Sequence, residues 1–399
     1  MLHQFKSLDQ FLVDNQVFWR FEPFFSSHSA VLPWQDSHTL LSQWLDSLSP
    51  ESIEQFKQDN DALVEAMSAY LPEVALISRW TNLPKLELDG LSLARGVDTG
   101  VPGRKLAQIV SMGEAALNAH EGEEWLEWCS GKGFLGRILA SQSGQRVTSF
   151  EYQQALCESG QHEADKQRLS MNFVQGDAFS PESIRAFHSN QHAVALHACG
   201  DLHVSLINKG VDKQLPAMTF SPCCYHLIQD ECYQPMSEAA KESKLSLNKS
   251  ELRIPLQETV TGGERVKKHR VEEMTFRLGF DLLLREVLSL EEYQPIPSIK
   301  KSQLSEGFEA FCLWASDKKS IALPKVDFVK YEEKGLQRYW QMERMSLVQQ
   351  PFRRALELWL VLDKALFLQQ SGYQVTLSQF CSRETTPRNI LVHAAKQQK

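Results

Sequence analysis

The chain has 399 residues, 42% of them hydrophobic, and a formal net charge of −8. Its length allows two or three domains, and no stretch is apolar enough to cross a bilayer, so the composition excludes a membrane-spanning protein. Asp9 and Asp14 interrupt the first apolar run, and eight cysteines lack disulfide-framework spacing. We therefore expect no signal sequence, reduced thiols and a cytoplasmic location.

The first part of the chain is acidic and is predicted to be helical. Residues 1–100 hold 14 acidic and 6 basic side chains, which accounts for the whole net charge, so we do not expect this part to bind nucleic acid itself. Thr39–Leu48 and Ser52–Tyr70 carry apolar residues at helical spacing, with prolines between them. We expect an N-terminal helical region over residues 1–95.

An alternation of helical and strand-like segments follows. Arg104–Ala119 has the pattern of an amphipathic helix. The expected strands are residues 124–129, 146–152, 172–178, 192–199 and 217–223. Because helical spacers separate the first four strands, the alternation predicts a parallel, Rossmann-like α/β sheet over residues 100–230.

The rest of the chain is predicted to be an insertion and then the end of the core. Residues 231–350 are expected to form a mainly helical insertion or lid, and residues 351–399 the last core helix, over Phe352–Gln370, and a C-terminal β-hairpin. Three basic clusters are candidates for contact with nucleic acid, although solvated helix faces are the more common explanation for each cluster taken alone. They are Arg265/Lys267/Lys268/His269/Arg270, Lys300/Lys301 and Arg353/Arg354.

A glycine turn follows the first expected strand. Gly131 and Gly133 allow a ligand to approach the backbone closely, and the helix that follows offers unpaired N–H groups at its start. Gly131-x-Gly133-x-x-Gly136 matches the dinucleotide fingerprint, and an acidic residue, Glu151, ends the next strand. The turn therefore predicts a nucleotide cofactor, and NAD is one alternative.

Acidic residues at the strand ends favour S-adenosylmethionine over NAD. Glu127 precedes the turn, where it would repel a pyrophosphate but attract the cationic amine and sulfonium of a methyl donor. Glu151 can accept hydrogen bonds from ribose hydroxyls, and Asp177 from an adenine amine. The predicted cofactor residues are Glu127, Ser130, Gly131, Gly133, Glu151, Tyr152, Asp177 and Ala178.

A second set of reactive side chains ends the fourth and fifth strands. Ligands of open parallel sheets bind beyond the carboxyl ends of the strands, so neighbouring strands should bring these side chains together beside the methyl group. The predicted catalytic residues are His197, Cys199, Asp201, Cys223, Cys224, Tyr225 and His226.

Several roles stay open for this set. Residues 221–225 can form a rigid shelf for a planar base or amine. Cys223 or Cys224, with Cys199, can act as nucleophile and helper in pyrimidine C5 methylation, and His197 or Asp201 can be a general base. The cysteines can also be small buried hydrophobes. We expect no metal site, because adjacent Cys223 and Cys224 do not easily face one tetrahedral zinc ion.

Three motifs resemble a known family. Trp128–Gly133, Ala195–Gly200 and Ser221–Gln229 are similar to the methyltransferase domain of glutathione S-transferase C-terminal domain-containing proteins, and Thr386–Asn389 to the wider methyltransferase-like superfamily. A more distant resemblance is to eukaryotic tRNA 2′-O-methyltransferases of the acceptor stem, whose Cys-Cys-His-His signature stands here as Cys223-Cys-Tyr-His226. The resemblance covers roughly residues 100–230 and the last 30, and no glutathione transferase domain or zinc-finger spacing is evident.

The resemblance implies a class I fold and S-adenosylmethionine bound at Glu127, Gly131, Gly133, Glu151 and Asp177. Through the distant kinship it implies an RNA acceptor, either tRNA or rRNA. We therefore expect an S-adenosylmethionine-dependent methyltransferase of RNA that has no membrane partner. The alternatives are a small-molecule or protein acceptor, a non-catalytic S-adenosylmethionine-binding scaffold, and an NAD-dependent dehydrogenase.

Overall fold

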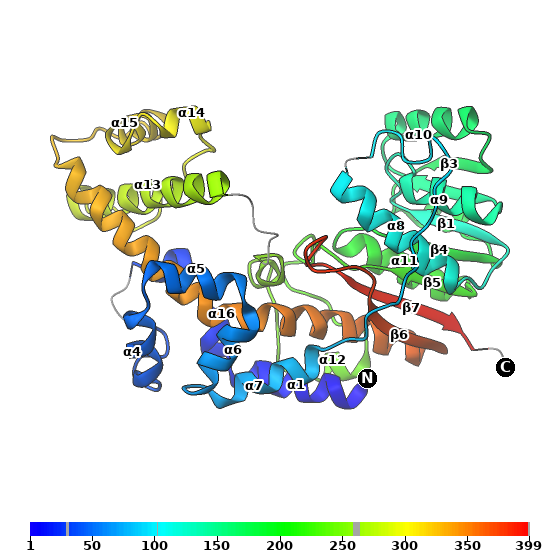
Figure 1. Cartoon of the computed structure of the whole chain (residues 1–399), viewed down its shortest axis with the longest axis horizontal. Helices are drawn as coiled ribbons and strands as arrows, with labels where there is room; N and C mark the ends of the chain where they lie inside the picture. Colours follow the sequence, from blue (N-terminus) through cyan, green and yellow to red (C-terminus); the bar gives the residue numbers. More distant parts are fainter. Residues whose placement is uncertain (29–31, 102, 258–263, 398–399) are drawn as a thin grey trace. The chain divides into compact units, whose positions relative to one another are not determined.

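The computed structural model describes residues 1–28, 32–101, 103–257 and 264–397. The chain divides into two compact units (Figure 1). The sheet unit comprises Met1–Asp14, Ser78–Val260 and Arg353–Lys399, and the helical unit comprises Asn15–Ile77 and Thr261–Phe352. This grouping differs from the four consecutive segments expected from the sequence, because most of the N-terminal helices and most of the insertion share one unit.

The sheet unit contains a seven-stranded sheet in the order β3-β2-β1-β4-β5-β7-β6. Strands β1 to β5 are parallel, and β7 is antiparallel to both β5 and β6. The strands are β1 (Glu124–Trp128), β2 (Val147–Glu151), β3 (Met171–Gln175), β4 (Gln191–Ala195), β5 (Ala217–Phe220), β6 (Tyr373–Gln379) and β7 (Ile390–Lys396). The predicted α/β class, the parallel sheet and the closing hairpin are confirmed.

Helices connect the strands and cover the sheet. Helix α9 packs on β1, β2 and β3, α10 on β2 and β3, and α11 against β5, while α8 packs on α9. Their shared core includes Met112, Ile138 and Leu139, which are almost fully buried. The helices of this unit include α1 (Leu2–Asp14), α8 (Gly103–Asn118), α9 (Phe134–Ser143), α10 (Gln154–Lys166), η2 (Pro181–Ala186), α11 (Asp201–Asp212), α12 (Glu238–Lys241) and η3 (Glu251–Gln257).

The described part of the helical unit contains only helices and their connections. They are α2 (Gln16–Trp19), α3 (Pro23–Ser26), α4 (Thr39–Ser47), α5 (Pro50–Gln58), α6 (Asn60–Ser68), η1 (Pro72–Val74), α13 (Glu264–Leu288), α14 (Lys301–Leu304) and α15 (Phe308–Lys319), and α7 (Ala75–Thr81) crosses the boundary. The expected helix over residues 52–70 is in fact two helices. The Asp59 carboxylate accepts a hydrogen bond from Ala62 N at 3.0 Å, which caps α6 and starts a new helix.

The last helix, α16 (Phe328–Gln370), is longer than the sequence predicted. The expected start at Phe352 was wrong, because the helix continues through the buried Pro351. Proline lacks an N–H and usually breaks a helix interior, so local sequence argued for a boundary that tertiary packing overrides. Helix α16 contributes residues to both units. Among the described residues, no helix is both long and apolar enough to cross a membrane.

Candidate active site

The glycine turn between β1 and α9 has the backbone that the sequence requires. Cys129, Gly131 and Gly133 have φ values of +55°, +59° and +68°, in the left-handed region. A Cβ on Gly133 would lie 2.5 Å from Phe173 Cζ, whereas a Cβ on Gly131 would meet nothing within 4 Å. Glycine is therefore required at position 133 by both the backbone conformation and the packing. At position 131 it is required by the backbone conformation alone, and the space beside it is open, as expected for a turn that faces a ligand.

Glu127 lies under the start of α9. Its side chain is 3% exposed and accepts a hydrogen bond from Ser149 Oγ at 2.9 Å. A Cβ on Gly136 would lie 2.5 Å from Glu127 Oε2, so the third glycine of the fingerprint makes room for this carboxylate. Burial raises the pKa of Glu127 to about 7, against hydrogen bonds from Gly136 and Ser149. Its contact with the amine of a methyl donor stays a prediction.

Glu151 joins the glycine turn to the end of β2. Its Oε2 accepts from Gly131 N and its Oε1 from Gln153 N, both at 2.9 Å. Each oxygen keeps a second lone pair. The carboxylate therefore holds the turn in place and can still accept from a ribose hydroxyl.

The other predicted cofactor residues lie around the ends of β1, β2 and β3. Ser130 is half-buried and its hydroxyl has no hydrogen-bond partner among the described residues, while Tyr152 is 67% exposed. Asp177 is exposed and accepts from Phe179 N at 2.9 Å. Ala178 is buried, and its carbonyl accepts from Lys209 Nζ at 2.9 Å. These positions leave Asp177 and Tyr152 open to a ligand.

The predicted catalytic cysteines converge where β4 and β5 end side by side. Cys199 and Cys223 form an isolated parallel bridge, and their Sγ atoms lie 3.5 Å apart. The Sγ atoms of Cys199, Cys223 and Cys224 all lie within 4.8 Å of one another. The adjacent Cys223 and Cys224 were expected not to face one tetrahedral ion easily, yet their sulfurs lie close together. Cys224 has a φ of +48°, which breaks the usual alternation of side chains.

The two loops after β4 and β5 are tied to each other. Gly200 N donates to Cys223 O, and Asp201 N donates to Leu227 O, both at 3.0 Å. The Asp201 carboxylate accepts from Gln229 N at 2.8 Å, so it fixes the second loop. A Cβ on Gly200, whose φ is +56°, would lie 2.0 Å from Leu227 O. The loops therefore form one rigid structure, with Asp201 as part of its frame.

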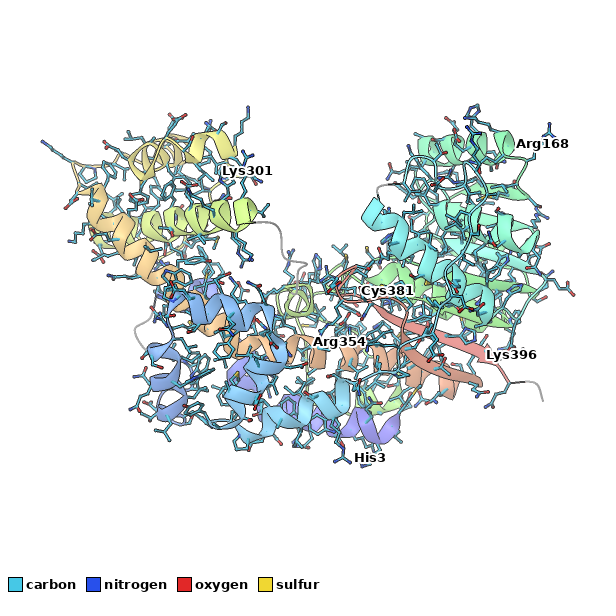
Figure 2. The ribbon with its side chains drawn as sticks, in the orientation of Figure 1. His3, Arg168, Lys301, Arg354, Cys381 and Lys396 are labelled. Carbon is cyan, nitrogen blue, oxygen red and sulfur yellow. The ribbon has the colours of Figure 1, made fainter. Side chains whose placement is uncertain are left out.

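Tyr225 points into the core. It is 2% exposed, and its hydroxyl donates to Pro222 O at 3.2 Å and to Glu357 Oε1 at 3.4 Å. Arg354, labelled in Figure 2, donates to Glu357 at 2.6 Å and to Asn389 Oδ1 at 2.9 Å. Arg354 is buried in this network and is not available to nucleic acid, which corrects its candidate role. The network anchors the cysteine loop on α16, and no local motif at Glu357 predicted it.

Cations surround the remaining predicted residues. The His197 imidazole is exposed on one side, and partial burial, with a smaller effect of Lys105, lowers its pKa to about 4. Burial and Arg253 lower the pKa of His226, whose Nδ1 has no hydrogen-bond partner among the described residues.

Hydrogen bonds with Cys199 and Cys223 lower the pKa of Cys224, and a third cation, Arg388, adds a smaller effect in the same direction. We call Lys105, Arg253 and Arg388 the rim cations. The sequence analysis missed Lys105 and Arg253, because both lie outside the basic clusters that it singled out, whereas Arg388 belongs to the Thr386–Asn389 motif.

A buried polar chain crosses the sheet away from these residues. His120 Nδ1 lies 3.1 Å from His192 Nδ1, His192 Nε2 lies 2.8 Å from Thr219 Oγ1, and Thr219 Oγ1 lies 2.8 Å from His393 Nδ1. We call these four residues the histidine chain. Burial lowers the pKa of His192 well below its usual value, and the neighbouring imidazoles add to this. The histidine chain is therefore uncharged at neutral pH.

Residues 104–231 match a protein family described as "Methyltransferase domain". Three similar solved structures are a tRNA (uracil-54, C5)-methyltransferase of Pyrococcus abyssi with S-adenosylhomocysteine (20% identity, TM-score 0.25), fibrillarin of Aeropyrum pernix with S-adenosylmethionine (18%, 0.25), and a putative sarcosine dimethylglycine methyltransferase of Galdieria sulphuraria (11%, 0.26).

The first two matches cover 29% of this chain and the third covers 34%. They span 28%, 52% and 52% of those proteins, respectively. The acceptors named for the first and third proteins differ, and none of the three matches assigns an acceptor to this chain.

Proposed function

We propose that the protein is an S-adenosylmethionine-dependent methyltransferase that methylates RNA, a proposal supported by the match of residues 104–231 to a methyltransferase family. The observation that carries the acceptor is the set of rim cations. Arg253 is exposed, Lys105 and Arg388 are half-buried, and they contribute to the pKa shifts of His226, His197 and Cys224, respectively. The phosphates of an RNA backbone supply the matching negative charge.

The donor side of the site is the edge formed by β1, β2 and β3. In this proposal Glu127 faces the cationic amine of the donor, Glu151 accepts from its ribose hydroxyls and Asp177 from its adenine amine. The bound donor supplies an electrophilic methyl group on a sulfonium. The turn between Trp128 and Phe134 holds that group because its backbone is fixed by the Gly131–Glu151 hydrogen bond.

The acceptor side is the edge formed by β4 and β5. His197 is the proposed general base, because its imidazole is uncharged and exposed at the end of β4. His226 lies on the loop after β5 and is proposed to orient the acceptor. Lys105 lies 5.9 Å from the ring centroid of Phe134, at the start of α9, and is close enough to His197 to affect its charge. Donor and acceptor sides are thus adjacent.

Helix α13 provides a second proposed RNA contact in the helical unit. Arg265, Lys268 and Arg270 are exposed on its first half. Arg270 Nη2 lies 3.5 Å from the buried carboxylate of Glu343, and His269 lies 3.5 Å from Glu272. Arg265 and Lys268 are the better candidates for phosphate contact, and the helical unit is proposed to take part in selecting the acceptor.

The cysteines support a cytoplasmic setting for this activity. All eight are free thiols in the structure, as expected for a protein in a reducing compartment.

The test is transfer of labelled methyl groups from S-adenosylmethionine into separated RNA, protein and metabolite fractions of a cell extract. We expect label in RNA, and RNA binding that weakens steeply with salt. The double variant Lys105→Gln/Arg253→Gln should raise KM for RNA. It should also reduce the slope of the logarithm of RNA affinity against the logarithm of salt concentration by about 2. Lys166→Gln, an exposed lysine of α10 whose nearest carboxylate is Glu163 at 3.8 Å, is the matched control.

Other outcomes discriminate between the alternatives. Label in the protein or metabolite fraction, or RNA binding that does not respond to salt, would exclude RNA as the acceptor. Donor binding without transfer into any fraction would favour a non-catalytic S-adenosylmethionine-binding scaffold.

A further inference from the structure

Three thiols at the acceptor edge have the spacing of metal ligands. The thiol cluster consists of Cys199, Cys223 and Cys224, whose Sγ atoms lie within 4.8 Å of one another. Tetrahedral zinc with Zn–S bonds of about 2.3 Å places its sulfur ligands about 3.8 Å apart. The Cys199–Cys223 separation of 3.5 Å is close to this value, so small side-chain adjustments bring all three sulfurs to bonding distance.

The backbone already holds the three thiols in place. Cys199 and Cys223 are bridged across the ends of β4 and β5, and Gly200 N donates to Cys223 O at 3.0 Å. The left-handed conformation of Cys224 turns its side chain toward the other two. A metal would therefore bind without reorganising the loops, which lowers the cost of binding.

Two imidazole nitrogens near the thiol cluster have no hydrogen-bond partner among the described residues. His203 is 2% exposed, and its Nδ1 lies 3.1 Å from Ala198 O, which leaves Nε2 unprotonated when Nδ1 donates. His226 Nδ1 is the other. Both imidazoles interact electrostatically with Cys224. Buried nitrogens without partners are uncommon in native proteins and here accompany three converging thiols.

We propose that the thiol cluster binds one Zn²⁺ ion through three thiolates and leaves the fourth coordination position open. The three sulfurs bind as thiolates, so the complex has a net charge of −1, and binding releases a proton from each sulfur that is still protonated. Arg388, which interacts electrostatically with Cys224, offsets this charge.

An open position at the acceptor edge is the pattern of a functional rather than a purely structural zinc ion. Its chemical consequence is direct: the three sulfurs become ligands, so none of them is a free nucleophile. The bound ion is available to polarise an oxygen or nitrogen of the acceptor. This assignment holds whether the acceptor is RNA or another molecule.

The test is metal content of the purified full chain after incubation with Zn²⁺ and dialysis. We expect about one zinc per chain, and at least about a 100-fold loss of affinity in Cys199→Ser, Cys223→Ser and Cys224→Ser. Cys232→Ser and Cys381→Ser, which change half-buried thiols outside the cluster, are the matched controls. With Co²⁺ as probe, the unaltered protein should show thiolate charge-transfer absorption that weakens in each cluster variant.

A measurement on the unaltered protein covers the case in which a variant fails to fold. Zinc should protect three thiols from a thiol-reactive dye, and a chelator should expose them again. The proposal would be overturned if the cluster variants bound zinc as tightly as the unaltered protein, or if zinc protected no thiols. A Cys199–Cys223 disulfide that forms in place of metal binding, in protein purified under reducing conditions, would also overturn it. S-adenosylmethionine binding, measured in the same samples, reports separately on the donor site.

Discussion

Replacing Glu151 by alanine tests the donor side most directly. Each oxygen of this buried carboxylate accepts one backbone N–H at 2.9 Å, from Gly131 and from Gln153. Glu151→Ala removes both acceptors, leaves the glycine turn without its anchor and deletes the proposed contact with ribose.

Hydrogen bonds to charged groups contribute about 1.5–3 kcal/mol each. Because the N–H of exposed Gln153 can turn to water, we assign a stability loss of about 2 kcal/mol, mainly from Gly131. Loss of the ribose contact should weaken S-adenosylmethionine binding by a further factor of about 10–100. Glu151→Gln keeps one acceptor oxygen, so its stability and its affinity for S-adenosylmethionine should lie between those of the unaltered protein and Glu151→Ala.

The assay is calorimetric titration with S-adenosylmethionine, S-adenosylhomocysteine and NAD, together with urea unfolding of each variant. Glu158→Ala is the matched control, because this exposed glutamate of α10 accepts only from Gln154 among the hydrogen bonds described here. A folded Glu151→Ala protein that binds the donor within about twofold of the unaltered protein would refute the reasoning. Binding of NAD but not of S-adenosylmethionine would favour the dehydrogenase alternative.

Three predictions concern the frame around the site. Burial lowers the folded-state pKa of His192 far below 6.5, so the unfolded chain alone takes up its proton as pH falls below about 6.5, and the folded state loses stability. When the pH falls from 7.5 to 5.5, the free energy of unfolding in urea should decrease by about 1.4 kcal/mol less in His192→Asn than in the unaltered protein. Equal decreases would contradict the neutral histidine chain. Gly200→Ala, whose Cβ would lie 2.0 Å from Leu227 O, should cost about 3 kcal/mol or more by overpacking and strain, whereas exposed Gly103→Ala should be nearly neutral; thermal unfolding compares them. Asp363, fully buried, accepts from Tyr233 Oη and from the amides of Met236 and Ser237, so Asp363→Ala should cost about 3–5 kcal/mol; an unchanged Tm would show that water replaces the carboxylate.

The strands and the glycine turn followed from local sequence. Short apolar runs, glycines that adopt positive φ and an acidic residue at each of three strand ends are local features, and the sheet bears out their positions to within a few residues. Gly133 shows why: its left-handed backbone and its contact with Phe173 exclude a side chain, so the requirement is visible as a glycine in the sequence.

Other residues depended on neighbours that are distant in the chain. Tyr225 was expected at the reacting atoms, yet Glu357 on α16 accepts its hydroxyl in the core. Cys223 and Cys224 were expected beside Cys199 but not easily facing one metal ion, and the left-handed backbone of Cys224 accompanies three sulfurs that lie within 4.8 Å of one another. Long-range hydrogen bonds and a single backbone angle decide these directions, and neither leaves a periodic pattern.

The amino-acid sequence alone determined the α/β core, the glycine turn and the hairpin that closes the sheet, because these depend on residues close together in the chain. Tertiary structure alone decided that the helices α2 to α6 join α13 to α15 in one unit, and that α16 continues through Pro351. Each of these needs packing or hydrogen bonds between distant segments, whose free energy outweighs local preference.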